Sequence, residues 1–206
     1  MPKSATAEQA HVFDRTRQHQ KKREALILAA AHAFHENGYA GTTLDMIASR
    51  LGVTKKALYH YVDGKNEILF EIFSLWLDMQ AEAIAQAAKQ GRTADEKVRL
   101  YARQYVTAVY RNLIPMDRIV GEIETLDESA VKTIQRRRRA NDKKLREFFE
   151  AGAGKEFADW DPKYAVYVLN GAIDWMFKWL KPEGPEKPDA AADKVVDILM
   201  QGLTPR

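Results

Sequence analysis

The chain has 206 residues, of which 46% are hydrophobic, 30% charged and 10% aromatic, and its formal net charge is +3. At roughly 100–200 residues per domain this length allows one or two domains, and the lack of cysteine excludes a disulfide framework, a thiolate metal site and a cysteine nucleophile. No stretch approaches the roughly 20 apolar residues of a membrane-spanning helix, and the polar segment from Met1 to Arg23 does not resemble a secretory signal, so we expect a cytoplasmic protein with no membrane partner.

Charged and aromatic residues are divided unevenly along the chain. Residues 1–65 hold ten Lys or Arg against six Asp or Glu, whereas residues 66–206 hold 22 against 23. All five histidines lie in the first part and all four tryptophans lie in the second. This division predicts a small basic module that meets a polyanion and a larger, aromatic-rich body.

The spacing of apolar residues predicts an all-α fold of about nine helices. Several segments repeat apolar residues at intervals of three and four, and none shows a sustained period of two. Residues 1–20 have few apolar side chains, so we expect a mobile basic arm there. The next helix begins at Lys21 and ends near Asn37, because Gly38 favours a helix C-terminus.

Two short helices and one long helix follow. Two threonines, the second of them Thr43, offer an N-cap for a helix over about 44–51, and Thr54 caps a second helix over about 55–61. After an Asp-Gly break, one long helix spans about 65–89. The remaining segments are predicted as helices over about 94–113, 116–126, 128–150, 162–180 and 189–203, with a loop over 151–162.

The segment from Leu44 to Tyr61 has the residue spacing of a helix-turn-helix. Ala48 is small enough to let the two helices cross closely, and Gly52 can adopt the positive φ of a tight turn. The apolar residues between the helices are Ile47, Leu51, Val53 and Leu58. The outward, donor-rich face of the second helix then consists of Thr54, Lys55, Lys56, Tyr59 and His60.

The run from Ala30 to Leu69, AAHAFHENGYAGTTLDMIASRLGVTKKALYHYVDGKNEIL, resembles the DNA-binding region of the TetR family of bacterial repressors. It has that family's Gly-Tyr helix end, threonine-rich cap, Ile-Ala pair, Gly-Val-Thr turn and Leu-Tyr-x-Tyr recognition helix. It departs at Val62, where the family usually has Phe, and at Gly64, where the family usually has Ser. The resemblance implies a DNA-binding domain over 21–64 and a ligand-binding and dimerisation domain over 65–206.

The resemblance also implies a function. A homodimer would bind a pseudo-palindromic double-stranded DNA operator as a repressor and would be released by a small effector. The recognition helix would enter the major groove, and the starts of flanking helices would bind phosphates. The residues assigned to DNA are Thr43, Thr54, Lys55, Lys56, Tyr59, His60 and Lys65, with Lys21, Lys22 and Arg23 as additional charge contacts.

The family further implies that the last two helices pair with those of a second copy. The helix over 163–180 is apolar nearly all round, so it needs partners on two sides, and the final helix continues its apolar surface. The predicted interface residues are Val166, Ile173, Val195, Ile198 and Leu199.

Aromatic residues and one arginine indicate where an effector binds. Aromatics at helical spacing usually pack in a core, and the candidates for a ligand wall are Tyr105, Phe149, Trp175 and Trp179. Four consecutive arginines, 136–139, span about 300° of a helix, so one of them, best Arg138, should face inward. A buried arginine needs a partner, which is either an acid such as Asp142 or Glu122 or an anionic ligand.

The segment Asn170–Gly184 holds a Trp-x-x-x-Trp-x-x-Pro pattern similar to one in TetR members that sense acyl-CoA thioesters, although packing at a dimer interface also explains it. We expect a small hydrophobic effector such as an acyl-CoA or a fatty acid, no cofactor and no metal. We do not expect an enzyme, because the sequence has no Gly-rich phosphate loop, no His-Glu-x-x-His site and no histidine after His60. The alternative function is a helical interaction or scaffold protein that does not bind DNA.

Overall fold

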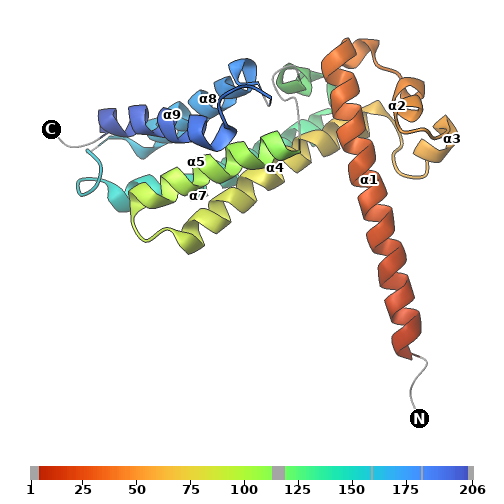
Figure 1. The fold of residues 1–206 in the computed structure, drawn as a ribbon, viewed down its shortest axis with the longest axis horizontal. Coiled ribbons are helices and arrows are strands. Elements are labelled where there is room, and N and C mark those ends of the chain that lie inside the picture. Colours follow the sequence, from red (N-terminus) through yellow and green to blue (C-terminus); the bar gives the residue numbers. More distant parts are fainter. Residues whose placement is uncertain (1–4, 113–118, 159, 182, 204–206) are drawn as a thin grey trace. The chain divides into compact units, whose positions relative to one another are not determined.

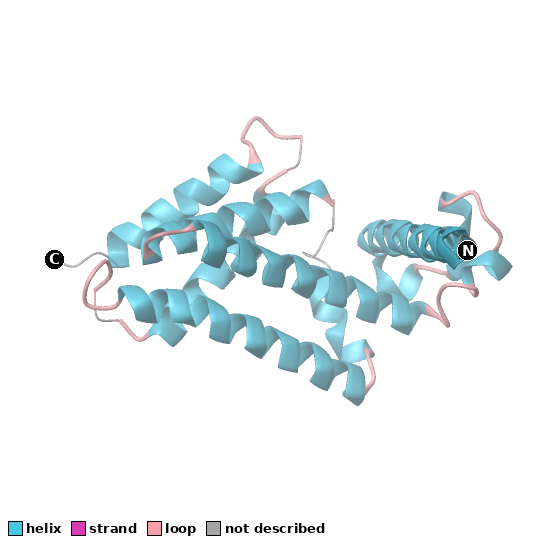
Figure 2. Cartoon of the chain, turned by 90° about the horizontal axis from the view of Figure 1, so that it is seen from below, coloured by secondary structure: helices cyan, strands magenta, loops and turns pink. Residues whose placement is uncertain are grey.

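The computed structural model describes residues 5–112, 119–158, 160–181 and 183–203. The chain divides into two compact units, Met1–Ile72 and Phe73–Arg206. Within the described residues the regular elements are eight α-helices and one 3-10 helix (Figure 1). A second view shows these helices joined by short loops (Figure 2). The predicted all-α fold is confirmed.

The first unit contains α1 (Ala5–Gly41), α2 (Leu44–Arg50), α3 (Lys55–Leu58) and the first turns of α4 (Lys65–Gln90). Helix α1 is kinked at Gly38, whose φ of 73° and ψ of 160° interrupt the helical backbone. The kink lies at the glycine that the sequence marks as a helix end.

Residues 5–20, where we expected a mobile basic arm, are helical and continue α1, so regular structure extends further than the composition suggests, and the mobility of the arm stays a prediction. This stretch has few apolar side chains, but it contains no glycine or proline and several good helix formers such as alanine and glutamine. It also continues a helix whose later turns are packed, at Leu26 and Phe34 for example. Extending an existing helix needs no new nucleation, so modest propensity is enough.

Apolar side chains from α1, α2, α3, α4 and the segment between α3 and α4 fill the interior of the first unit. The buried residues are Leu26, Ile27, Ala30, Phe34, Ile47, Ala48, Leu58, Val62, Ile68 and Leu69. Val53 is 43% exposed, although we predicted it between the two helices. It lies in the turn after α2 rather than on either helix, so neither helix covers it.

The second unit contains the rest of α4 together with α5 (Ala94–Arg111), η1 (Val120–Thr125), α7 (Glu128–Gly152), α8 (Pro162–Trp179) and α9 (Pro188–Leu203). Helix α5 packs against α7 and α9, and α8 also packs against both (Figure 1). Central buried residues are Val98, Tyr101, Tyr105, Leu145, Leu169 and Ile173.

The boundaries in this unit follow local signals. Thr93 and Glu96 form a reciprocal capping box at the start of α5, and Pro162 occupies the first turn of α8. The helix predicted over 116–126 falls partly outside the described residues, and its described part is the 3-10 helix η1.

Candidate DNA interface and effector cavities

Two threonine caps and one glycine build the turn between α2 and α3. Thr43 Oγ1 accepts a hydrogen bond from the Met46 backbone N–H at 3.2 Å, and Thr54 Oγ1 accepts one from the Ala57 backbone N–H at 3.3 Å. Gly52 has a φ of 65°, as its place in the turn predicts. Each threonine hydroxyl keeps its own O–H as a donor, which can bind a phosphate oxygen.

The outer face of α3 and of the turn that follows it carries the predicted recognition side chains. Lys55, Lys56, Tyr59 and His60 are exposed, whereas Leu58 between them is buried. The short helix is therefore held by its inner face and presents donors outward, which is the arrangement that a major groove requires.

The two lysines of this face differ in their partners. Lys55 Nζ lies 2.8 Å from Asp45 Oδ2, and this hydrogen bond raises the pKa of Lys55. Lys56 has no hydrogen-bond or ion-pair partner among the described residues. Because Asp45 offsets the charge of Lys55, Lys56 offers the more available positive charge to a polyanion.

Lys65 has a structural role that the sequence did not reveal. Its ammonium donates to the backbone carbonyls of Tyr39 at 2.7 Å and Thr42 at 2.8 Å, and it lies 4.5 Å from the centre of the Tyr39 ring. Cations are favourable beside the free carbonyls at a helix C-terminus. Lys65 therefore caps the end of α1 through two of its three donors, and its assignment as a phosphate contact stays a prediction.

Arg23 is also held within the first unit. Its guanidinium donates to Glu67 Oε1 at 2.8 Å and to the Tyr61 carbonyl at 3.3 Å, and it lies 2.9 Å from Glu71 Oε2. The hydrogen bonds to Glu71 and Glu67 raise the pKa of Arg23. Arg23 therefore joins α1 to α4, which corrects its assignment as a free charge contact with DNA.

In the second unit, two of the predicted ligand residues belong to the core. Tyr105 is fully buried, and its ring stacks on that of Tyr101 with 5.7 Å between centroids. Phe149, near the end of α7, is buried against Phe157 with 5.7 Å between ring centroids. Both side chains are covered by neighbouring rings, so we correct their assignment from ligand wall to packing.

The other two predicted ligand residues face outward. Trp175 is 65% exposed and Trp179 is 48% exposed. They lie on the side of α8 away from Val166, Leu169 and Ile173, which are buried. The four predicted aromatics therefore do not meet around one cavity, because they lie on different faces of different helices.

The arginine that turns inward is Arg137 rather than Arg138. Arg137 donates to Asp78 Oδ1 at 2.5 Å and to the Ser74 carbonyl at 3.3 Å, both on α4. Arg138 is exposed and lines a cleft of about 410 Å³ between α7 and α8. This corrects the prediction of an inward Arg138, because the rotation of α7 about its axis aims the preceding residue at α4.

Two carboxyl groups share the cleft with Arg138. Burial raises the pKa of Asp174 to about 6; the positive charge of Arg138 opposes this shift, and the negative charge of Asp142 adds to it. Burial also raises the pKa of Asp142, again against the charge of Arg138. Arg138 therefore acts on both acids through the field of its charge, while the described residues form no direct ion pair with it.

A buried hydrogen-bond network crosses the second unit. Asn141 Nδ2 on α7 donates to Gln80 Oε1 on α4 at 3.0 Å, and Gln80 Nε2 donates to the Tyr101 hydroxyl on α5 at 3.1 Å. The hydroxyl donates to Asn170 Oδ1 on α8 at 2.8 Å, and Asn170 Nδ2 donates to Asp142 Oδ1 at 3.1 Å. In the sequence this network is indicated only weakly, by single amide residues that interrupt otherwise apolar helix faces. Satisfied buried polar groups fix the relative register of four helices.

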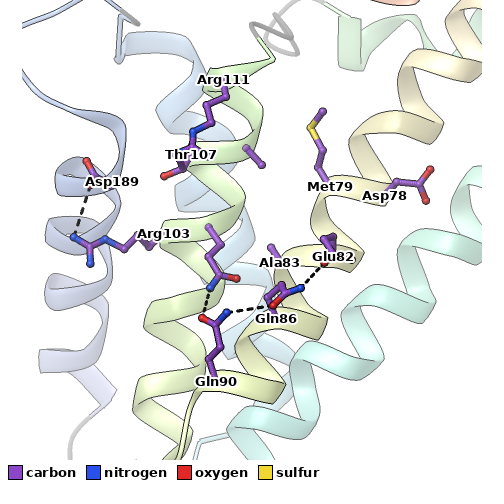
Figure 3. A pocket seen from close by; sticks show the side chains of 12 residues that line it. Asp78, Met79, Glu82, Ala83, Gln86, Gln90, Arg103, Thr107, Arg111 and Asp189 are labelled. Atoms are coloured by element: carbon purple, nitrogen blue, oxygen red, sulfur yellow. Dashed lines mark hydrogen bonds and ion pairs between the residues drawn. The ribbon is translucent and has the colours of Figure 1, made fainter. Parts of the chain in front are cut away.

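A cavity of about 610 Å³ lies between α4 and α5 (Figure 3). Its walls include Met79 and Gln86 of α4 and Gln104 and Arg111 of α5, with Asp189 of α9 at one side. None of the predicted ligand residues lines it. The volume lies within the roughly 300–1,000 Å³ range of small-molecule sites.

Helix α8 has two apolar faces. Val166 and Ile173, which we predicted at the dimer interface, are buried inside the chain, so we correct them to core residues. The opposite face exposes Tyr164, Tyr167, Val168, Trp175 and Trp179. On α9, Ile198 is 73% exposed, and Val195 and Leu199 are half-buried.

The described residues contain no group of three or more His, Cys, Asp or Glu side chains that could hold a metal ion. None of the helices in the described part of the chain is long and apolar enough to cross a membrane.

Comparisons with known proteins agree with this geometry. Residues 26–72 match the family described as bacterial regulatory proteins, tetR family, and residues 91–203 match the tetracyclin repressor-like C-terminal domain. The HTH-type transcriptional activator FasR of Mycolicibacterium smegmatis is 25% identical over 189 residues, 89% of this chain and 84% of FasR. The fatty acid metabolism regulator protein of Bacillus subtilis is 25% identical over 198 residues, 91% of this chain and 98% of that protein.

A solved structure extends the similarity to the whole fold. The crystal structure of AibR in complex with isovaleryl coenzyme A and operator DNA superposes with a TM-score of 0.70 and 25% identity. The alignment covers 89% of this chain and 98% of the AibR chain. With both of its units matched to one family and its recognition helix exposed, the chain belongs to the TetR family of DNA-binding transcriptional regulators.

Proposed function

We propose that the protein is a dimeric repressor that binds a pseudo-palindromic operator and leaves it when a small acyl effector binds. The observation that carries the proposal is the recognition segment, a short helix whose inner residue Leu58 is buried and whose outer donors are exposed. The helices do not specify the base sequence of the operator or the identity of the effector. DNA binding, dimerisation and effector binding are therefore each tested separately.

Contact with DNA rests on the exposed donors of α3. Thr54, Lys56, Tyr59 and His60 are exposed, and Lys55 becomes available if its pair with Asp45 opens. Thr43, at the start of α2, is exposed and offers a hydroxyl to a phosphate. One short helix makes few base contacts, so high affinity requires two subunits on two half-sites.

The operator is found by gel shift with genomic fragments and located by footprinting. Lys56→Ala should then weaken operator binding by about 1–3 kcal/mol if it contacts a base, and less if it contacts a phosphate. If Lys56 contacts a phosphate, the slope of the logarithm of the binding constant against the logarithm of salt concentration should also become shallower by about one unit. Lys143→Ala, at an exposed position of α7, is the control. If both variants bind the operator with the same affinity and the same salt dependence, α3 does not contact the DNA.

The proposal of a homodimer rests on the outward face of α8. Five large apolar side chains are exposed on it, and Ile198 on α9 adds to the exposed apolar surface. Isolated exposed apolar residues are ordinary, but a contiguous row of aromatics on one helix marks an interaction surface. A second copy presents the same row, so a two-fold axis lets the two rows cover each other.

Ile198→Glu tests this interface without disturbing the core, because the side chain is 73% exposed in the single chain. We expect a folded monomer with weakened operator binding, measured by sedimentation velocity and circular dichroism. Ala190→Glu places the same charge at another exposed position of α9 and should leave the dimer intact. An intact Ile198→Glu dimer would show that α9 is not at the interface.

The effector class rests on the relatives and on the cavities of the second unit. One relative is named a fatty acid metabolism regulator, and one similar structure holds isovaleryl coenzyme A together with operator DNA. Acyl-CoA thioesters or fatty acids are therefore the proposed effectors. They would act by favouring a conformation in which the two recognition helices no longer fit both half-sites.

Titration of acyl-CoAs of increasing chain length into the complex of the protein with labelled operator tests this effector. We expect release of DNA, seen as a fall in fluorescence anisotropy, at micromolar ligand. In a purified transcription system the protein should lower transcript from an operator template, and the effector should restore it. No response to any acyl-CoA or fatty acid contradicts the effector class, and a rise in transcript on adding protein contradicts repression.

A further inference from the structure

The cavity between α4 and α5 has a chain of amides at one end (Figure 3). Gln104 Nε2 donates to Gln90 Oε1 at 2.9 Å, and Gln90 Nε2 donates to Gln86 Oε1 at 3.2 Å. Gln86 Nε2 then donates to Glu82 Oε1 at 2.7 Å. The chain runs in one direction and leaves Gln104 Oε1 buried without a hydrogen-bond donor. A buried acceptor without a donor is costly, so a ligand N–H or O–H at this end of the cavity would favour a rotation of Gln104 that brings its Oε1 into reach.

The other end of the cavity offers donors. Arg111 and Thr107 line it from α5, and Arg111 has no acidic partner among the described residues. Of the acids nearby, Asp78 pairs with Arg137 at 2.5 Å and Asp189 lies 3.8 Å from Arg103. Glu82 accepts a hydrogen bond from Gln86 at 2.7 Å, and Glu183 lines an adjoining cavity together with Arg111 without forming an ion pair with it. The guanidinium of Arg111 is therefore available to a carboxylate or a phosphate.

A second cavity, of about 490 Å³, adjoins the first at this end. The two share Thr107, Arg111 and Asp189, and the second is also lined by one further cation, Lys187, and one further acid, Glu183. An anion seated on Arg111 thus lies where the two cavities meet, and a larger anionic group can extend toward a second cation.

The two ends are separated by a fixed distance along one helix. Gln104 and Arg111 lie seven positions apart on α5, which is about 10 Å at 1.5 Å per residue. Met79, Ala83 and Ala108 supply an apolar wall between them. The matching ligand is elongated, with an N–H or O–H donor about 10 Å from an anionic group.

We propose that this cavity binds the phosphopantetheine arm of a coenzyme A thioester, with the phosphate on Arg111 and an amide N–H or hydroxyl donating to Gln104 Oε1. The proposal rests on the acyl effector proposed above and narrows it to the thioester. A free fatty acid has a carboxylate for Arg111 but no donor for Gln104. The ligand would bridge α5 to α4, which is one continuous helix from Lys65 to Gln90.

Isothermal titration of the full chain with pantetheine 4′-phosphate, coenzyme A and palmitate tests the proposal. The first two should bind the wild type, and Arg111→Gln should weaken both by about tenfold, the loss expected for one charge-assisted contact. Gln104→Leu should weaken both but should not affect palmitate, which has no donor for Gln104, whereas Arg111→Gln should also weaken palmitate, because its carboxylate would use the same guanidinium. Arg136→Gln, which removes an exposed arginine outside the cavity, is the control and should bind as the wild type does.

Two results would overturn the proposal: no binding of pantetheine 4′-phosphate to the wild type, or equal binding to the wild type and to Arg111→Gln. The proposal that an acyl-CoA is the effector can be contradicted independently of the proposal for this cavity. If acyl-CoA releases operator equally from the wild type and from Arg111→Gln, the cavity assignment is wrong and the effector stands. If pantetheine 4′-phosphate binds through Arg111 but no acyl-CoA releases operator, the cavity assignment stands and the effector is wrong. Arg111 is exposed, and circular dichroism verifies that its variant is folded.

Discussion

Asp174 should make the protein less stable as the pH rises from about 4 to about 7. Burial raises the pKa of Asp174 from 3.8 to about 6 in the folded chain. Between these two values the folded state holds a proton that the unfolded state has lost, so the free energy of unfolding falls as the pH rises. A shift of about two units corresponds to at most about 3 kcal/mol, reached when the pH exceeds the folded pKa.

Asp174→Asn removes this titration, because an amide does not ionise in this range. The free energy of unfolding of the variant minus that of the wild type should rise from near zero at about pH 4 to as much as about 3 kcal/mol at about pH 7.5. Urea denaturation followed by circular dichroism at one protein concentration measures it, since the proposed dimer would make stability depend on concentration. Glu147→Gln, at an exposed position of α7, is the control. A difference that stays constant across this range would refute the reasoning.

Two further predictions concern stability. Tyr101→Phe removes the hydroxyl that links Gln80 to Asn170, so it should lower the free energy of unfolding by about 1–3 kcal/mol, and an unchanged urea midpoint would show that the network contributes nothing. Gly52→Ala should cost about 1–2 kcal/mol in thermal or urea unfolding, because an L side chain is strained at a φ of 65° even though the space beside it is open; Gly64→Ala, with open space and no positive φ, is the matched control.

Local signals in the sequence were sufficient to predict most helix ends and turns of the first unit. The caps at Thr43 and Thr54 and the positive φ of Gly52 and Gly38 satisfy needs of the adjoining backbone, so they depend on few distant residues. The helical state of residues 5–20 was missed because their composition lacks apolar residues, whereas their helix is an extension of a packed one.

Partners of charged side chains could not be predicted in the same way. Lys65 caps carbonyls more than twenty positions earlier in the chain, and Arg23 pairs with carboxylates on a different helix. Four arginines in a row lie 100° apart around α7, and only the rotation of that helix decides that Arg137 meets Asp78 while Arg138 stays exposed.

By itself the sequence determined the all-α fold and the helix-turn-helix, and it showed that α8 carries apolar residues on more than one face. Only the tertiary structure decided which face of α8 is inside. Val166 and Ile173 on one face, and Tyr164, Val168 and Trp175 on the other, recur at the same helical spacing, so periodicity cannot rank them. The choice depends on which face fits between α7 and α9, which is a property of their combined shape.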